Sequence, residues 1–327
     1  MKKISQNLKK YSKQIIFLLV FLFVFNIGYE NYWNVFATRK IHSQIFNAQE
    51  ILPCNDKVYG SFEEHALKVH YIDVGQGDCI FIELPNQETV LIDAGTPKSK
   101  DKIIEYIKSL NYNKINHIIA THPHADHIGS MKAVLDNFFV ENLYLPPIEA
   151  KTITYKKTID TAKNKKITIN YSAEQGLNIL DYYNLSFDII SPVQNVEYSD
   201  LNNWSIVSYL KFGQSDFLFT GDAEQEAEEK ILKEDINIET DVLKVGHHGS
   251  RTSSSVSFIE RIKPKIAVIS CGKNNKYKHP HVETLELFNL KKIQVLRTDI
   301  LGDIIINSDS KEQFNIICEK ENYLQIK

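Results

Sequence analysis

Three histidines and an aspartate fall within six residues of this chain, directly after a short apolar run. The sequence THPHADHIG follows the apolar residues 115–120, which predict a strand. Imidazole and carboxylate groups are the ligands that zinc accepts in catalytic sites. On an extended loop, His122 and His124 can face one metal ion, while Asp126 and His127 can face a second ion from the start of a helix. The cluster therefore predicts a metal site at the end of a strand.

Apolar runs separated by turn residues predict many strands and a few helices along the rest of the chain. Strands are expected at residues 69–74, 79–84, 89–93, 115–120, 185–190, 205–212, 217–220, 242–245, 266–270, 294–297, 303–306 and 314–318. Helices are expected at residues 100–110, 126–138 and 223–233. Strands outnumber helices but are interleaved with them, which favours two sheets with helices outside, an α+β architecture.

The composition is that of a folded globular protein, with 43% hydrophobic and 24% charged residues. The formal net charge of -3 excludes a global basic field, so a polyanionic substrate would have to be bound locally. The four cysteines contain no CxxC pair and indicate neither a zinc ribbon nor a disulfide scaffold. Cys79 and Cys271 lie in or beside apolar strands and are expected to be buried free thiols.

Residues 1–45 differ from the remainder and predict a targeting segment and linker. A cluster of lysines precedes an apolar run at residues 15–25, which is the pattern of a positive n-region and a hydrophobic h-region. The run is shorter than the roughly 20 residues of a full membrane span. An uncleaved membrane anchor and a cleaved signal are equal alternatives here. In either case residues 46–327 are expected to form one exported domain, because the lysines stay on the cytoplasmic side.

The segment HPHADH resembles the HxHxDH signature of the metallo-β-lactamase superfamily. Further segments resemble the competence DNA-internalisation (ComEC-type) branch of that superfamily and occur in the same order. They are residues 73–78 (DVGQGD), 91–95 (LIDAG), 219–224 (FTGDAE), 244–250 (KVGHHGS), 279–280 (HP) and 298–299 (TD) followed by Gly302. The resemblance implies an αββα sandwich, the metallo-β-lactamase fold, with metal ions at one edge of the two sheets.

The resemblance also implies a set of metal ligands, carried over position by position. They are His122, His124, Asp126, His127, Asp222 and a histidine of the pair His247 and His248. His122, His124 and Asp222 would hold one ion, and the remaining ligands would hold a second ion that Asp222 shares. The residues themselves support Asp222, which follows the predicted strand 217–220 at a glycine turn, although a helix N-cap is the alternative role there.

Two features leave the ligand set open. One histidine of the pair can bind metal while its neighbour points away, and we favour His247 slightly over His248. Many superfamily members supply another histidine between HxHxDH and the bridging aspartate, whereas no histidine lies between His127 and His247 here. Residues 203–205 (NWS) occupy the comparable place and resemble an element of the ComEC-type branch. The expected cofactor is therefore one or two divalent ions, with Zn²⁺ first and Mn²⁺ as the alternative.

The expected chemistry is attack by a metal-activated water on a phosphorus or carbonyl centre. Asp126 is the expected catalytic residue, because it can orient that water as well as bind metal. Ser250 and His279 are expected to contact the substrate or stabilise developing charge. Lys278 is the expected contact for a polyanion, since it lies in the basic stretch 273–278 beside His279 and Tyr277. A second lysine-rich stretch at residues 151–166 is more typical of a solvated face.

These features predict an exported, metal-dependent phosphodiesterase or nuclease that acts on DNA or nucleotides, either secreted or anchored in the membrane. One alternative is a small-molecule hydrolase of lactams or thioesters, against which the missing histidine argues. Another is a non-catalytic, membrane-tethered binding module, against which the complete HxHxDH cluster argues. No obligate protein partner is evident. The single short apolar segment also excludes a DNA channel formed by this chain alone.

Overall fold

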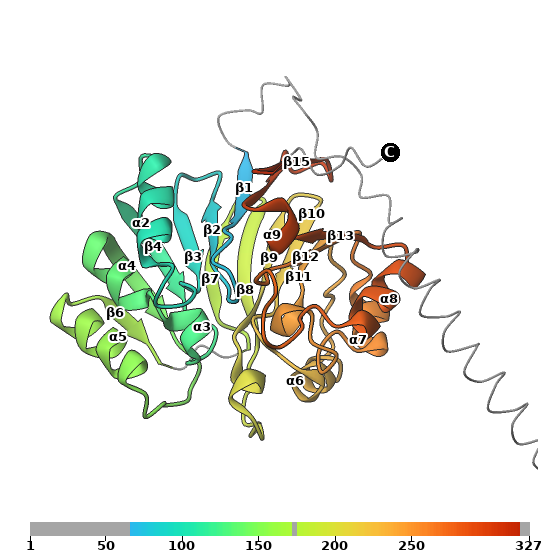
Figure 1. The fold of residues 1–327 in the computed structure, drawn as a ribbon, viewed down its shortest axis with the longest axis horizontal. Coiled ribbons are helices and arrows are strands. Elements are labelled where there is room, and N and C mark those ends of the chain that lie inside the picture. The colour runs from blue at the N-terminus through green and yellow to red at the C-terminus, as the bar shows by residue number, and fades with distance from the viewer. Residues whose placement is uncertain (1–65, 172–174, 321–327) are drawn as a thin grey trace, which may run out of the picture. The chain divides into compact units, whose positions relative to one another are not determined.

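The computed structural model describes residues 66–171 and 175–320, which build two facing β-sheets flanked by helices (Figure 1). The first sheet has eight strands in the order β15-β14-β1-β2-β3-β4-β5-β6, and the second has seven in the order β13-β12-β11-β10-β9-β8-β7. The predicted targeting segment at residues 1–45 lies outside the described residues.

The strands of the first sheet are β1 (Leu67–Tyr71), β2 (Ile80–Glu83), β3 (Thr89–Ile92), β4 (Lys114–Ile119), β5 (Phe139–Tyr144), β6 (Thr168–Asn170), β14 (Ile304–Ser308) and β15 (Phe314–Cys318). Those of the second sheet are β7 (Asn178–Tyr182), β8 (Leu185–Ser191), β9 (Val207–Phe212), β10 (Ser215–Phe219), β11 (Val242–Lys244), β12 (Ile266–Ile269) and β13 (Gln294–Arg297). The α-helices are α2 (Lys100–Ser109), α3 (Ala125–Ile128), α4 (Met131–Asn137), α5 (Ile153–Asn164), α6 (Gln225–Ile231), α7 (Val256–Ile262), α8 (Val282–Leu290) and α9 (Thr298–Leu301), and two short 3-10 helices are η1 (Leu201–Trp204) and η2 (Gly246–Gly249).

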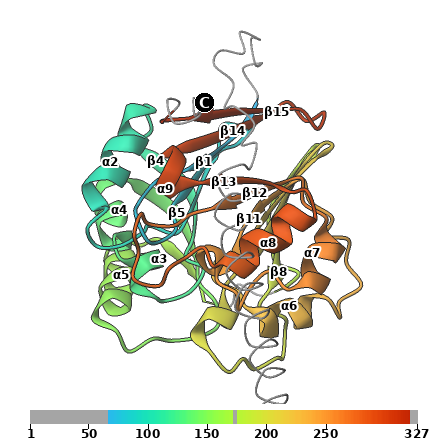
Figure 2. The ribbon, with the colours of Figure 1, turned by 45° about the vertical axis from the view of Figure 1, so that its right-hand side comes forward.

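Helices α2, α4 and α5 cover the outer face of the first sheet, and α6, α7 and α8 lie on the other side against the second sheet (Figures 1 and 2). The position of β2 between two cores explains why its residues 80–82 are all apolar. Ile80 and Ile82 belong to the core between the two sheets, whereas Phe81 belongs to the core beneath the helices. Successive side chains of a strand point to opposite faces, so a strand with both faces covered is apolar throughout. The αββα sandwich predicted from the sequence is confirmed.

The parallel parts of the two sheets position the candidate site. Strands β3, β4, β5 and β6 are parallel in the first sheet, and β10, β11, β12 and β13 are parallel in the second. The carboxyl ends of parallel strands meet at one edge of a sheet, where ligand sites of such sheets form. The loops after β3, β4, β10 and β11 therefore bring residues from distant parts of the sequence to the same place.

The single helix expected at residues 126–138 is wrong, because the structure has two short helices there, α3 and α4. The N–H groups of Gly129 and Ser130 donate to the carbonyl groups of Gly95 and Ala94 rather than to the preceding helical turn. Gly129 also lies so close to Pro97 that a Cβ atom would be 2.4 Å from the proline Cδ. The loop after β3 thus divides the predicted helix in two.

Several other elements differ from those expected from the sequence. The strand expected at 205–212 begins only at Val207, after the 3-10 helix η1. Residues 149–171, which had been assigned no element, contain α5 and β6, and α7, α8 and β7 were likewise not predicted. The burial of Cys79 and Cys271 as free thiols is confirmed.

Candidate metal centre

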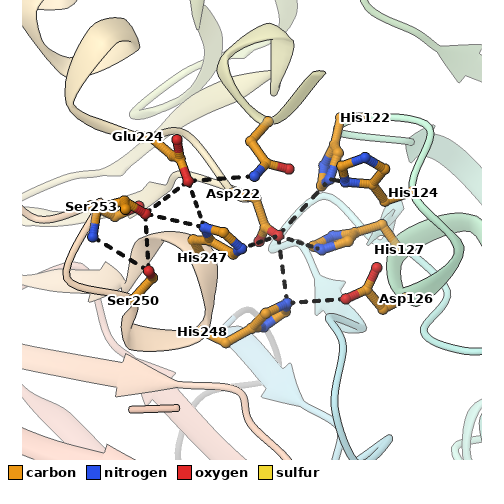
Figure 3. A network of polar contacts seen from close by, with 12 residues as sticks. His122, His124, Asp126, His127, Asp222, Glu224, His247, His248, Ser250 and Ser253 are labelled. Atoms are coloured by element: carbon orange, nitrogen blue, oxygen red, sulfur yellow. Dashed lines mark hydrogen bonds and ion pairs between the residues drawn. The ribbon is translucent and has the colours of Figure 1, made fainter. Parts of the chain in front are cut away.

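Asp222, in the loop after β10, lies at the centre of a cluster of imidazole groups (Figure 3). Its Oδ2 atom is 3.1 Å from Nε2 of His127, 3.5 Å from Nε2 of His248 and 3.9 Å from Nε2 of His122. The Nε2 atom of His247 is 3.8 Å from the same oxygen. The structure thus brings the HxHxDH loop, Asp222 and the histidine pair together, although up to 126 residues of chain separate them.

The other two residues of the HxHxDH loop lie at the rim of this cluster. Nδ1 of His124 is 2.9 Å from Nε2 of His122, and Oδ2 of Asp126 is 3.6 Å from Nε2 of His248. Four sets of ligand atoms within the described residues lie close enough together to hold a cation. Two of them consist of ligands predicted from the sequence, namely His122, His127 and Asp222, and Asp126, His127 and His248.

The imidazole rings are held from behind by groups that fix which nitrogen faces the centre. Nδ1 of His127 donates to Oδ2 of Asp93 at 2.7 Å. Nδ1 of His248 donates to the carbonyl oxygen of Ser270 at 2.9 Å, and Nδ1 of His122 lies 3.1 Å from the hydroxyl of Thr121. A neutral ring that donates through Nδ1 presents an unprotonated Nε2, which is the arrangement found behind metal-binding histidines.

Several buried polar atoms of this centre make no hydrogen bond, and this indicates that the centre fits a cation. Oδ1 of Asp222, Nε2 of His127 and Nε2 of His248 are buried and accept or donate no hydrogen bond within the described residues. Leaving such atoms unsatisfied costs about 1–3 kcal/mol each, so their convergence calls for a ligand. Carboxylate and imidazole atoms in this number are the donor set of a divalent transition metal such as zinc.

Burial and neighbouring charges shift the pKa values of the histidines in this centre in different directions. Burial and the neighbouring His127 hold the pKa of His122 well below its usual range. Burial would also lower the pKa of His248, but the carboxylates of Asp222 and Asp78 outweigh it and raise that pKa to about 9. Such an excess of buried carboxylate is stabilised by positive charge, which a divalent cation can supply.

The two adjacent histidines have different surroundings, and the geometry favours His248 as the metal ligand. His248 is buried, and it belongs to the ligand groups that the fold forms. His247 is 24% exposed, and its Nδ1 donates to Oε1 of Glu224 at 2.9 Å. The sequence favoured His247 slightly, because residue type alone does not show which ring is buried. Both residues have a left-handed backbone, with φ angles of 46° and 54°, a strained conformation typical of functional sites.

Residues 203–205, which the sequence offered in place of a further histidine, lie beside the candidate metal centre. The hydroxyl of Ser205 lies 3.3 Å from Nδ1 of His122 and accepts a hydrogen bond from the N–H of Asp222. Oδ1 of Asn203 accepts hydrogen bonds from the N–H groups of Glu224 and Ala227 at the start of α6. This segment therefore orients ligands and offers no imidazole of its own.

A cavity of about 310 Å³ opens onto the cluster. Besides metal-centre residues it is lined by Gln76, Tyr277 and His279. Nε2 of Gln76 and Nδ1 of His279 are buried and have no hydrogen-bonding partner within the described part of the chain. Burial, together with the neighbouring His247, lowers the pKa of His279 to about 4. His279, which the sequence predicted as a substrate contact, is thus a neutral ring in the wall of this cavity.

The structure places the two other predicted substrate contacts outside this cavity. Ser250 is buried at the end of η2, where its hydroxyl lies 2.9 Å from that of Thr252. Lys278 does not line the cavity of the metal centre but a neighbouring one, which shares His279 with it.

Four functional residues had no role assigned from the sequence. Asp93 orients His127, and Glu224 orients His247. Asp78 lies 3.4 Å from Nδ1 of His248, and its other oxygen is paired at 2.6 Å with the buried ammonium group of Lys244. Each acid stands at the end of an apolar strand or in a glycine turn, and that position was the available signal.

Comparison with known proteins agrees with this geometry. The family model described as the metallo-beta-lactamase superfamily matches residues 72–273. The chain belongs to this superfamily.

Its resemblance to competence proteins is confirmed by two relatives. ComE operon protein 3 of Bacillus subtilis (strain 168) is 34% identical over 254 residues, which is 72% of this chain and 32% of that protein. Recombination protein 2 of Haemophilus influenzae is 28% identical over 245 residues, which is 73% of this chain and 29% of that protein.

The chain therefore spans about a third of the length of these curated relatives. Among solved structures, the metallo-beta-lactamase fold protein YhfI from Bacillus subtilis is 10% identical, with a TM-score of 0.49. That similarity covers 74% of this chain and 100% of the other.

Proposed function

We propose that this chain is a metal-dependent hydrolase of phosphodiester bonds, with a nucleic acid as its substrate. The observation that carries the proposal is the convergence of buried ligand atoms of Asp222, His127 and His248, which lack hydrogen bonds, beside an open cavity that Asp222 and His248 line. The competence relatives support a nucleic acid as the substrate class.

The metal would be held by His122, His127 and Asp222, with Asp126 and His248 completing a second set of ligands. When bound, a divalent cation supplies nucleophilic hydroxide at neutral pH, because it lowers the pKa of water towards about 7. We propose Zn²⁺ as this cation and Mn²⁺ as the alternative, because a set that combines imidazoles with carboxylates accepts both.

The protein's own groups would orient the reaction. The carboxylate of Asp126 lines the cavity, and although burial opposes its ionisation, the nearby rings of His248 and His127 keep its pKa below the usual range. Asp126 is therefore an anion at neutral pH and can accept a hydrogen bond from the attacking water. Gln76 and His279 present buried nitrogen atoms to the cavity and can bind the oxygens of a phosphodiester.

We also propose that the hydrolase acts outside the cytoplasm, as a secreted or membrane-anchored protein. The lysine cluster and the apolar run at residues 15–25 support export. The part of the chain that the structure describes has no helix with the length and apolar character of a membrane span.

The proposed activity is tested with the purified full chain loaded with Zn²⁺ or Mn²⁺. We expect cleavage of end-labelled single-stranded DNA and of bis(p-nitrophenyl) phosphate, and loss of both activities with loss of metal in His127→Ala. His117→Ala is the matched control, because His117 lies on β4 and contacts Tyr144 outside the metal centre. A metal-loaded protein that cleaves neither substrate would exclude this function. Turnover of nitrocefin or a thioester would favour a small-molecule hydrolase, and a metal-free purified chain would favour a binding module.

A further inference from the structure

A second cavity, of about 790 Å³, adjoins the metal centre. His279 lines both cavities, so the two adjoin at this residue. Two hydrogen bonds hold the backbone of His279 in place. Oδ1 of Asn275 accepts the N–H of His279, and Nδ2 of Asn275 donates to the carbonyl oxygen of His279. A ligand that extends from the metal centre past His279 would therefore meet the second cavity.

The second cavity is rich in positive charge. Four cationic side chains and one carboxylate line it, namely those of Lys273, Lys278, Arg297, Lys320 and Asp299. The carboxylate is already engaged, because Arg297 donates to both oxygens of Asp299 at 3.0 Å and 2.8 Å. Because the chain as a whole carries a net charge of -3, this local excess is not a consequence of overall composition.

Two of these cations are available for a ligand. Lys320 lies 3.4 Å from a carboxylate oxygen of Asp73, whereas Lys273 and Lys278 have no acidic partner within residues 66–171 and 175–320. Ammonium groups without acidic partners, facing one cavity, match the charge of successive phosphates in a nucleic acid backbone.

An exposed aromatic ring stands beside the junction of the two cavities. Tyr277 is 48% exposed and lines the cavity of the metal centre. Its ring stacks on that of His279 with a centroid distance of 5.7 Å, and Nζ of Lys276 lies 4.8 Å from its centroid. An exposed ring within a basic groove is the platform on which unpaired bases stack in proteins that bind single strands.

We propose that the cavity of Lys273 and Lys278 binds backbone phosphates of a single-stranded nucleic acid whose scissile bond lies in the metal centre, with a base stacked on Tyr277. This inference rests on the proposed phosphodiesterase function and specifies its substrate as a strand that extends beyond the cleaved bond. A mononucleotide or a small phosphodiester fills only the cavity of the metal centre.

The test is binding of a fluorescent 12-nucleotide single strand to the full chain in EDTA, measured by anisotropy at several salt concentrations. We expect the double variant Lys273→Gln and Lys278→Gln to raise Kd about tenfold and to flatten the slope of log K against log salt by about 1.4, since each single-strand contact contributes about 0.7. Tyr277→Ala should weaken binding by a similar factor, and Tyr277→Phe should not.

The matched control is Lys151→Gln with Lys156→Gln, which removes the same charge beside a different cavity, the one next to α5. Equal weakening by both double variants, or no change in the first, would overturn the proposal. Binding of vesicles of anionic lipid in place of DNA would also overturn it. With metal restored, the Lys273 and Lys278 variant should lose more of its activity on the 12-nucleotide strand than on bis(p-nitrophenyl) phosphate. Strand binding without any hydrolysis by the wild type would refute the proposed function and leave this binding site standing.

Discussion

At the residue scale, the position of a single nitrogen atom separates histidines that look alike in the sequence. His247 and His248 are neighbours, yet only His248 places an unpartnered Nε2 beside Asp222 and Asp126. His247 instead donates to Glu224 at the rim of the cavity. Residue types predicted that a metal centre exists, but burial and the partner of the other ring nitrogen decide which ring binds.

Replacement of each histidine by alanine tests this assignment. We expect His248→Ala to lose metal and activity together, because a buried ligand and its support on Ser270 are removed. His247→Ala, the matched control, should keep most of the bound metal. Elemental analysis of the two purified variants decides between them, and the reverse result would return the ligand role to His247.

Gln76 is another residue whose role depends on a single contact. Its Oε1 accepts the N–H of Gly272 at 3.1 Å, so its amide nitrogen is directed away from that contact and has no partner. Glu at this position keeps the acceptor and removes the donor. We expect Gln76→Glu to lower kcat for bis(p-nitrophenyl) phosphate by about 10² with unchanged metal content, as for loss of one transition-state donor. An unchanged kcat would show that the amide does not contact the reacting group.

At the scale of elements, the sequence predicted most strands and the carboxyl-edge position of the site correctly. Apolar runs such as 266–270 are long and bounded by polar residues, so their pattern alone identifies them. Helix α5 was not predicted, because the many lysines of residues 151–166 make the sequence look polar throughout, although Tyr155 and Ile159 form a buried face. The break between α3 and α4 was also not predictable, since hydrogen bonds to the distant loop at Ala94 and Gly95 cause it.

The start of α6 depends on a side chain from outside the helix. Asn203 accepts the N–H groups of Glu224 and Ala227, which the helix itself leaves without acceptors. We expect Asn203→Ala to lower the free energy of unfolding by about 1–2 kcal/mol, as for loss of a helix cap. Chemical denaturation measures this value. Exposed Asn137→Ala at the end of α4 is the control, and equal effects of the two substitutions would contradict the capping role.

At the scale of the whole molecule, hydrogen bonds to the carboxylate of Glu83 join β1, β2 and the segment after α2. Glu83 accepts hydrogen bonds from His70 at 2.9 Å and Tyr112 at 2.8 Å. Burial alone would raise the pKa of Glu83, but these hydrogen bonds outweigh it and lower the pKa to about 2. Because the folded state holds the charged form, the stabilisation is complete above pH about 4.5 and is lost as the pH falls towards 2.

Unfolding by urea at several pH values tests this contribution. Near pH 7 we expect Glu83→Gln to be less stable than the wild type by about 2 kcal/mol, the typical value of a hydrogen bond to a charged group. The difference should shrink between pH 5 and pH 2. The exposed Glu105→Gln in α2 is the control for general charge effects. A difference that stays constant with pH would exclude ionisation of Glu83 as its origin.

Removal of metal should also lower the stability of the whole fold. A cation that binds only the native state stabilises it by about 2.7 kcal/mol when its concentration is a hundred times Kd. We therefore expect chelation to lower the Tm by several degrees, and readdition of Zn²⁺ to restore it. In Asp222→Asn the chelator should change the Tm little. An unchanged Tm in the chelated wild type would show that the centre binds no metal.

The centre draws its ligands from both sheets, His122 and His127 from the first and Asp222 and His248 from the second. The two loops meet so closely that a Cβ atom on Gly221 would be 2.9 Å from Cβ of Thr121. A nascent chain that has reached only β6 possesses the complete HPHADH motif but lacks half of the ligands. The complete set of candidate ligands is therefore assembled late in biosynthesis, only after the second sheet has folded against the first, and no proteolytic fragment confined to one sheet contains it.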